Sequence, residues 1–164
     1  VQHMPASFTK PLAWRLDSLG ELSIREAAGG DLLEPNHVLI APGGKHLQVR
    51  RVGTSAKAVV RNGAPVSGHM PSADVLMKSV AETFGENCLG VIMTGMGRDG
   101  SDGCRAIRAA GGYVLGQDEA SSDVYGMNKV AYAEGNVDRQ FALREAAAVL
   151  TRHVRSRWAL ASRV

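Results

Sequence analysis

The sequence of 164 residues predicts an α/β fold with a mostly parallel sheet. Three observations support this expectation. Helical and extended patterns alternate along the chain, as they do when helices pack on a parallel sheet. The most apolar run, residues 89–93, suits a buried parallel strand and stops at a glycine-rich turn. Apolar residues make up 45% of the chain and glycines number 19, which together indicate one globular domain with many tight turns.

The first half of the chain contains one predicted helix and several short strands. The helix covers residues 8–19, with Pro11 in its first turn and Leu12, Leu16 and Leu19 on one face. The remaining elements of this half are strands at 22–26 and 38–41 and a β-hairpin whose strands are 47–52 and 56–61.

The second half alternates helices with apolar strands. Ser72 is placed to cap a helix over residues 73–85, because its hydroxyl can accept from a free backbone N–H. The buried strand at 89–93 and the glycine-rich turn follow, and then a helix over 101–110. The elements predicted after this point are a strand at 113–115 and helices at 126–134 and 142–156.

The glycine-rich turn allows two interpretations. Gly95, Gly97 and Gly100 match the G-x-G-x-x-G pattern of dinucleotide sites, and Asp118 follows at the right distance. However, Asp99 places a negative charge where that pattern needs to bind a phosphate. In the second interpretation Asp99 orients an imidazole, and the backbone N–H near Met96 faces a developing oxyanion. A structural role for Asp99 as a plain helix cap also remains open.

Two of the five histidines lie in similar turns. His3 and His69 each begin a His-Met-Pro segment, whereas His46 begins a hairpin strand. His37 and His153 are expected at the solvent-exposed surface. The chain contains no Ser in a G-x-S-x-G turn and no Cys with a nearby His. The residues therefore predict a base, an orienting carboxylate and an oxyanion turn without a nucleophile.

Composition argues against several other classes of protein. Aromatic residues make up only 5%, which argues against a base-stacking surface, and the arginines after residue 151 fit a solvated helix end. No apolar run approaches the roughly 18 residues that cross a membrane. Asp99 and Asp102 match no standard metal motif. Cys88 and Cys104 lack metal spacing and are expected as reduced, buried thiols of a cytosolic protein.

Several of these segments, in this order, resemble the catalytic domain of the CheB family of chemotaxis protein-glutamate methylesterases. The resemblance extends from residue 1 to about 150 and leaves 151–164 as a basic helix end or tail. The segments that carry it are Gln2-His3-Met4-Pro5, Ile40-Ala41-Pro42-Gly43 with His46, Gly68-His69-Met70-Pro71-Ser72 with Asp74, the run from Gly90 to Gly100, the run from Gln117 to Ser122, and Gly126-Met127.

The resemblance implies a Ser-His-Asp hydrolase on a doubly wound, Rossmann-like, three-layer α/β sheet. Such an enzyme removes methyl groups from glutamate esters on chemoreceptor helices and deamidates receptor glutamines, with no metal or organic cofactor. Carried over to this sequence, His3 is the general base and acid, and Asp99 orients it. The backbone N–H of Met96 contributes to the oxyanion hole. Three further residues line the cleft: His69, Ser72 and Asp74.

The resemblance also implies parts that lie outside this chain. The nucleophilic Ser and the first strand are expected upstream of His3, as is a regulatory receiver domain, so we expect an N-terminally truncated domain that is inactive alone. Asn128 departs from the Pro that often occurs at this position. A cytoplasmic methylesterase is thus the expectation. A non-catalytic chemoreceptor-binding module and a nucleotide-binding domain are the alternatives, and neither nucleic acid nor membrane insertion is expected.

Overall fold

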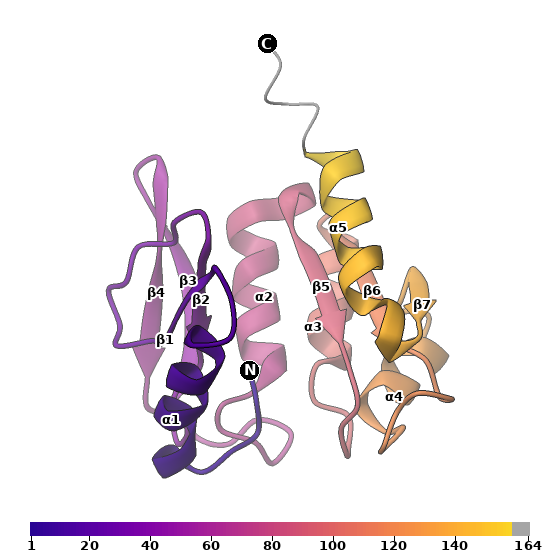
Figure 1. Ribbon diagram of the computed structural model, residues 1–164, viewed down its shortest axis with the longest axis horizontal. Coiled ribbons are helices and arrows are strands. Elements are labelled where there is room, and N and C mark those ends of the chain that lie inside the picture. Colours follow the sequence, from indigo (N-terminus) through magenta and orange to yellow (C-terminus); the bar gives the residue numbers. More distant parts are fainter. Residues whose placement is uncertain (159–164) are drawn as a thin grey trace.

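The computed structural model describes residues 1–158 and contains short strands alternating with helices (Figure 1). Two 3₁₀ turns, η1 (Gly85–Asn87) and η2 (Leu143–Glu145), connect larger elements. In chain order the helices and strands are α1 (Ala6–Asp17), β1 (Ser23–Glu26), β2 (His37–Ile40), β3 (His46–Val52), β4 (Ser55–Arg61), α2 (Ala73–Phe84), β5 (Leu89–Ile92), α3 (Ser101–Ala109), β6 (Tyr113–Gln117), α4 (Met127–Ala133), β7 (Arg139–Phe141) and α5 (Ala146–Arg157).

The described strands form three separate sheets rather than one continuous sheet. β1 pairs with β2, and β5, β6 and β7 pair in that order, all in parallel. β3 and β4 form the predicted antiparallel hairpin. Helix α2 packs against both β3 and α3, so it joins the two halves of the molecule. The mostly parallel α/β class is therefore confirmed, although the sheet is divided.

The sheet of β5, β6 and β7 has packed side chains on both faces. Val114 belongs to a core with Ile92 and Ile107, beneath α2, α3 and α4. The next residue, Leu115, belongs to a different core, with Phe141 of β7 and Val149 of α5. Because successive side chains of a strand point to opposite faces, these two cores lie on opposite sides of the sheet. This part of the chain is a three-layer, doubly wound unit.

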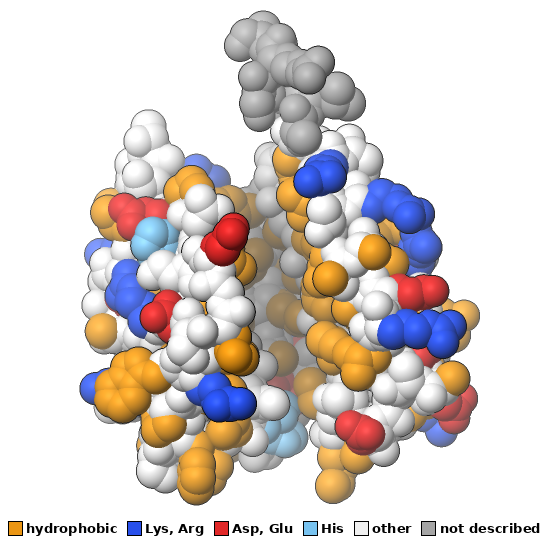
Figure 2. Space-filling model, in the orientation of Figure 1, with side chains coloured by type: hydrophobic (Ala, Val, Ile, Leu, Met, Phe, Trp, Pro, Cys, Tyr) orange, Lys and Arg blue, Asp and Glu red, His pale blue; other side chains and the backbone are white. Residues whose placement is uncertain are grey.

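A hollow separates the two halves on the face shown in Figure 2, and hydrophobic side chains line it. In the same orientation, β1 and β2 lie on one side of this hollow and β5 on the other (Figure 1). Among residues 1–158, no strand of the β1–β2 sheet pairs with β5 across this hollow. The N-terminal segment that carries His3 lies close to the hollow, beside α1 and α2 (Figure 1).

Helix α1 begins two residues before the predicted start. Pro5 is its N-cap residue, so Pro11 lies inside the helix and not in its first turn. Pro11 removes one helical hydrogen bond, and a short surface helix with only Thr9 and Ala13 buried tolerates this loss. Leu19 lies beyond the end of the helix and is 67% exposed.

The C-terminal part of the fold also differs from the expectation. Strand β7 has only three residues and was not predicted, because so short a segment carries no clear alternation. The last helix begins at Ala146, after η2, and not at residue 142. Of the predicted basic end, residues 151–157 continue α5, and residues 159–164 lie outside the described part of the chain. Within residues 1–158, every helix is too short or too polar to cross a membrane.

Candidate active site

The loop at Gly43-Gly44 lies between the two His-Met-Pro segments, and its two glycines let the chains approach closely. A Cβ atom on Gly43 would lie 2.5 Å from the nitrogen of Ala6 and 2.7 Å from the carbonyl oxygen of Met4. On the other side, the Gly44 N–H donates to the carbonyl of Met70 at 3.1 Å. The loop therefore lies between the segments of His3 and His69 and sets their separation.

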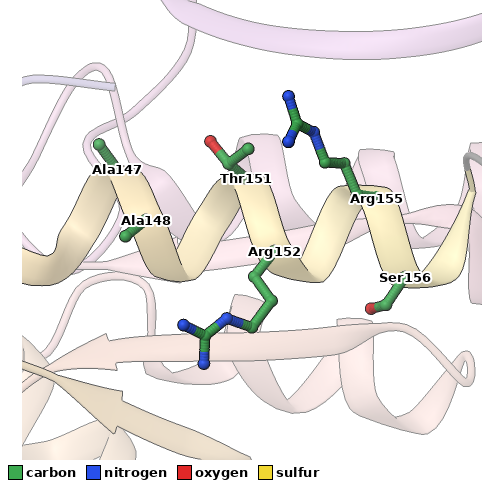
Figure 3. A pocket seen from close by; sticks show the side chains of 6 residues that line it. All are labelled: Ala147, Ala148, Thr151, Arg152, Arg155 and Ser156. Atoms are coloured by element: carbon green, nitrogen blue, oxygen red, sulfur yellow. The ribbon is translucent and has the colours of Figure 1, made fainter.

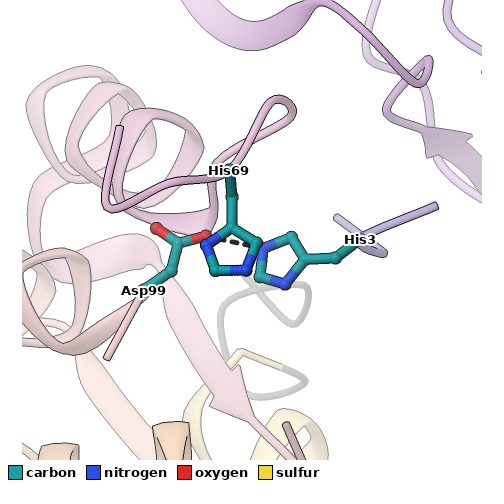
Figure 4. Close-up of side chains that lie close together, drawn as sticks. All are labelled: His3, His69 and Asp99. Carbon is teal, nitrogen blue, oxygen red and sulfur yellow. Dashed lines mark hydrogen bonds and ion pairs between the residues drawn. The ribbon is translucent and has the colours of Figure 1, made fainter. Parts of the chain in front are cut away.

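The imidazole rings of His3 and His69 stack on each other, with 3.8 Å between centroids and 19° between planes (Figure 4). His69 ends a tight turn in which it exchanges two backbone hydrogen bonds with Val66. Ser67 and Gly68, at the centre of this turn, both have positive φ, as in a type I′ turn. The Nδ1 atom of His69 lies 2.8 Å from the Ser67 carbonyl, which fixes the ring orientation.

Asp99 is fully buried and accepts hydrogen bonds from four groups. Its Oδ2 lies 2.7 Å from Nε2 of His3 (Figure 4). The other donors are the Ser72 hydroxyl at 2.6 Å, the Ala73 N–H at 2.7 Å and the Asp74 N–H at 3.1 Å.

Burial alone would raise the pKa of Asp99, but these hydrogen bonds outweigh it and hold the pKa below its ordinary value. Asp99 is therefore an ionised acceptor at neutral pH. His3 must then donate to it through Nε2–H, because an ionised carboxylate has no proton to give. The lone pair of the His3 ring is consequently on Nδ1, which is the atom available to take a proton.

Asp74 and Asp99 cap each other's helices. Asp99 precedes α3 but accepts from the first amides of α2, whereas Asp74, in the first turn of α2, accepts from Gly103 of α3 at 2.7 Å. The sequence placed Asp99 at the start of its own helix; the structure shows that it caps the neighbouring one. Burial, together with the charge of Asp99, raises the pKa of Asp74 above its usual range.

The same contacts argue against a dinucleotide site. A phosphate at the start of α3 would compete with Asp74 for the amide of Gly103 and would meet the charge of Asp102 in the first turn. Asp118, the expected ribose ligand, instead accepts from the backbone and hydroxyl of Ser121 at 3.0 and 2.6 Å. The glycines of this turn instead allow close packing: a Cβ on Gly95 would lie 2.4 Å from Sδ of Met127, and one on Gly100 would lie 3.1 Å from the Ile92 side chain.

The glycine-rich turn is held by hydrogen bonds to the last residue of β6 and to the segment that follows it. The Thr94 N–H donates to Oε1 of Gln117 at 2.9 Å, and the Gly95 N–H donates to the Val124 carbonyl at 3.0 Å. Met96, at the tip, is 78% exposed, and its backbone N–H finds no acceptor among residues 1–158. The Met96 amide therefore stays free at the tip of a turn whose first residues are hydrogen-bonded.

Asn128 supports this bracing segment. Its side chain is fully buried at the start of α4 and donates to the Gln117 carbonyl at 2.9 Å and to the Ser122 hydroxyl at 2.8 Å. Where the resemblance leads us to expect a proline, this asparagine therefore makes hydrogen bonds that a proline could not make. Neither of these hydrogen bonds involves His3 or Asp99.

Sequence reasoning left His46 without a role. This ring is buried, with Nε2 2.9 Å from the Ala64 carbonyl, while Nδ1 accepts from the Ser72 N–H at 3.3 Å. His46 therefore positions Ser72, which in turn contacts Asp99. The sequence placed His46 shortly after Gly43-Gly44, within a segment that carries the family resemblance, but gave it no partner.

The two histidines expected at the surface behave differently from each other. His37 is exposed, as predicted. His153 is half-buried and stacks on Tyr113 at 4.4 Å between centroids, so that expectation was wrong. Burial, together with the nearby charge of Arg157, lowers the pKa of His153. Both cysteines are free and buried, and burial raises the pKa of Cys104 to about 12.

A depression along α5 is separate from these groups. Its side chains supply two guanidinium groups and two hydroxyls but neither an imidazole nor a carboxylate (Figure 3). It therefore offers no group for acid–base chemistry near neutral pH. The residues that line it are Ala147, Ala148, Thr151, Arg152, Arg155 and Ser156.

A doubly wound α/β domain with an ordered histidine–carboxylate pair beside a glycine-rich turn belongs to a structural class in which hydrolases are common. Comparison with known proteins makes this specific. The CheB methylesterase family matches residues 1–150, and the chain belongs to that family.

Named relatives and a solved structure agree with this membership. The chain is 48% identical over 153 residues to a protein-glutamate methylesterase/protein-glutamine glutaminase of Treponema denticola, covering 93% of the chain and 41% of the relative. It is 50% identical over 143 residues to one from Koribacter versatilis, covering 87% and 39%. The chain thus spans about two fifths of the length of these relatives. The crystal structure of the Thermotoga maritima CheB methylesterase catalytic domain matches with a TM-score of 0.90 at 34% identity, covering 93% of this chain and 81% of that domain.

Proposed function

We propose that this chain supplies the base, the orienting carboxylate and one oxyanion donor of a protein-glutamate methylesterase that also deamidates glutamines. The observation that carries the proposal is the 2.7 Å contact between His3 and an ionised, fully buried Asp99. A carboxylate in this setting fixes one tautomer of the imidazole and stabilises its charged form. The names of the relatives supply the reaction and the substrate class.

The proposed reaction is acyl transfer through a serine outside this chain. That serine attacks the side-chain ester carbonyl of a methylated glutamate while Nδ1 of His3 takes its proton. The oxyanion is held by the backbone N–H of Met96, a contact typically worth about 3 kcal/mol of barrier. His3 then protonates the departing methanol, and a water activated by His3 releases the carboxylate. For a glutamine, the leaving group is ammonia.

Ser72, Asp74 and His69 support the pair in different ways. Ser72 donates to Asp99 and keeps one of its oxygens occupied. Asp74 fixes the relative position of α2 and α3 through Gly103. The His69 ring covers one face of His3. In this proposal none of the three takes part in bond making; His69 lines the cleft, while the expected cleft-lining residues Ser72 and Asp74 act from buried positions behind it.

The substrates in this proposal are methylated chemoreceptor helices, and the partner within the same full-length protein is a receiver domain. A cytoplasmic location follows from that substrate class. Activity is proposed without any metal or organic cofactor, because the serine supplies the nucleophile, the histidine carries each proton and the backbone donors stabilise the oxyanion.

The test is methanol release from a methylated chemoreceptor by the protein at its full natural length. His3→Ala and Asp99→Asn should each lower kcat by at least about 10³-fold. The first removes the base, and the second no longer holds the His3 imidazole in the tautomer with its proton on Nε2. His37→Ala is the matched control, since that exposed ring lies outside the site. Methanol release at the native rate by either site variant would refute the assignment. Receptor binding without hydrolysis by the native protein would favour a binding module.

A further inference from the structure

Glu134 binds both ends of the turn that carries Asp99. It is the residue that ends α4, and its side chain accepts from Arg98 through one carboxylate oxygen and from Ser101 through the other. We propose that Glu134 is a positioning residue, which fixes Asp99 against His3 without touching the substrate. Its contacts are features of the structure alone, whereas their effect on catalysis rests on the proposed function.

The turn between β5 and α3 is closed by its own backbone. The Ser101 N–H donates to the Arg98 carbonyl at 3.1 Å, so Asp99 and Gly100 are the two central residues. Gly100 has a φ of 94° and a ψ of −16°, which is typical of the third residue of a type II turn. Asp99 is then the second residue of a tight, hydrogen-bonded turn. Contacts that hold the two ends of this turn therefore also hold the backbone of Asp99.

Each oxygen of the Glu134 carboxylate binds one end of this turn. Oε1 lies 3.2 Å from Nη2 of Arg98, and Oε2 accepts from the Ser101 hydroxyl at 2.6 Å. The side-chain amide of Asn136 donates to Oε2 and to the Ser101 hydroxyl, both at 3.2 Å. The Ser101 hydroxyl thus donates one hydrogen bond and accepts another, which uses its proton and one of its lone pairs.

Burial makes the Ser101 contact the stronger of the two. Ser101 is fully buried, and within residues 1–158 the Glu134 carboxylate is the one acceptor of its hydroxyl. Loss of that acceptor leaves a donor unpaired away from water. The side chains of Arg98 and Glu134 are 54% and 37% exposed, so their ion pair contributes little by itself. Together the two contacts fix the direction of the turn, because one short carboxylate reaches both ends.

The other groups that hold Asp99 act on a different part of it. The first amides of α2 and the Ser72 hydroxyl donate to its carboxylate. Glu134 instead holds the backbone on either side of Asp99, from the end of α4. The carboxylate is therefore held from α2 and the backbone from α4, and both sets of contacts define the 2.7 Å separation between Asp99 and His3.

The test is methanol release from a methylated chemoreceptor by the protein at its full natural length. Glu134→Ala should lower kcat by about ten- to a hundredfold and leave KM within about twofold of the native value, because misplacing a catalytic group by about 1 Å can cost about 10²-fold. Glu134→Gln keeps an oxygen acceptor for Ser101 and should recover most of this loss. Urea unfolding establishes that each variant is folded.

Asp102→Asn is the matched control. It removes the charge of the other carboxylate beside Arg98, at 3.8 Å, without changing the contact with Ser101. Its kcat and KM should stay within about twofold of the native values.

An Asp99→Asn background separates positioning from a general loss of structure. If Glu134 acts through Asp99, Glu134→Ala should lower kcat there by less than about twofold, because the contact that it supports is already lost. The full ten- to hundredfold loss in that background would overturn the inference, as would a native kcat for Glu134→Ala by itself.

The tautomer of His3 gives a readout that does not need activity. In nitrogen NMR of the imidazoles, native His3 should carry its proton on Nε2, and Glu134→Ala should increase the Nδ1–H form. If the native protein releases no methanol but the tautomer shifts, the proposed function is refuted and the positioning role stands. If methanol release requires His3 but neither kcat nor the tautomer responds to Glu134→Ala, the function stands and the positioning role is refuted.

Discussion

Asp74 and Asp99 are neighbouring buried carboxylates whose pKa values are displaced in opposite directions. Both are shielded from water by the helices that they cap. For Asp99, four hydrogen bonds outweigh burial and lower the pKa; for Asp74, burial outweighs the single amide of Gly103 and raises the pKa. Each carboxylate also raises the cost of ionising the other. The charge is therefore concentrated on Asp99, which faces His3.

The raised pKa of Asp74 predicts that its charge lowers stability at neutral pH. A carboxyl group whose pKa is raised by folding does not change the free energy of unfolding below its unfolded pKa of about 3.9, where it is protonated in both states. As the pH rises, ionisation lowers the free energy of unfolding, and the loss is complete above the folded pKa. Asp74→Asn keeps an oxygen acceptor for Gly103 and removes the charge. We expect its free energy of unfolding in urea to match the native value near pH 4 and to exceed it at pH 7.

Asp74→Ala is the matched variant. It leaves the buried Gly103 N–H without an acceptor, and we expect it to lose about 1–3 kcal/mol at both pH values. If Asp74→Asn were as unstable as Asp74→Ala at pH 7, the ionised form of Asp74 would be required and our sign for its contribution would be wrong.

At the residue scale, the sequence predicted which residues matter better than it predicted their contacts. His3, Asp99 and Ser72 were identified from their motifs, and the structure brings them within hydrogen-bond distance of one another along one chain of contacts. The reciprocal capping of Asp74 and Asp99 was not foreseen, because it joins residues 25 positions apart through two helix starts. His46 was missed for the same reason: its partners are set by tertiary packing.

At the scale of elements, Gly43 positions the segment that carries His3. Gly43→Ala places a Cβ within 2.7 Å of the backbone of Met4 and Ala6, which cannot yield as a side chain would. We expect His3 to shift by about 1 Å and the rate of methanol release to fall by about 10²-fold. Gly20→Ala is the control, since a Cβ there meets nothing within 4 Å. Equal rates for the two variants would show that the loop does not position His3.

The contact between α2 and α3 depends on another glycine. A Cβ on Gly103 would lie 2.5 Å from Cβ of Met77, so Gly103→Ala overpacks the helix pair. Overpacking typically costs about 1–3 kcal/mol against a gain of about 1 kcal/mol in helix propensity, so we expect a net loss of up to about 2 kcal/mol in urea unfolding. In a Met77→Gly background, which removes that Cβ, the same substitution should cost less. If Gly103→Ala cost the same free energy of unfolding in that background, the strain would not come from the contact with Met77.

Most elements followed from local patterns in the sequence. The hairpin, α2 with its Ser72 cap, β5 and α3 lie within about two residues of their predicted bounds, because their periodicity and caps agree. The errors occur where local patterns conflict or are weak. Pro11 suggested a helix start, yet Pro5 is the N-cap, and β7 is too short to show alternation.

For the whole molecule, the parallel pairing was predictable, but the division into three sheets was not. Alternating helices and strands imply parallel neighbours, and β1–β2 and β5–β6–β7 agree. Which strand pairs with which depends on contacts distant in sequence, and no pattern in β2 or β5 shows that they remain unpaired with each other. The candidate site depends on both halves, since His3 enters beside α1 and Asp99 follows β5.

The divided sheet makes a prediction about the 164-residue chain by itself. The hollow between β1–β2 and β5 exposes strand edges and apolar side chains, and Phe8 and Trp14 of α1 add further apolar surface at 56% and 63% exposure (Figure 2). Unpaired edges and apolar patches promote association between chains. We therefore expect this chain to self-associate in light scattering and to unfold with a broad transition in urea. A monodisperse monomer with a sharp, cooperative transition would mean that the two halves hold together through α2 without further strands.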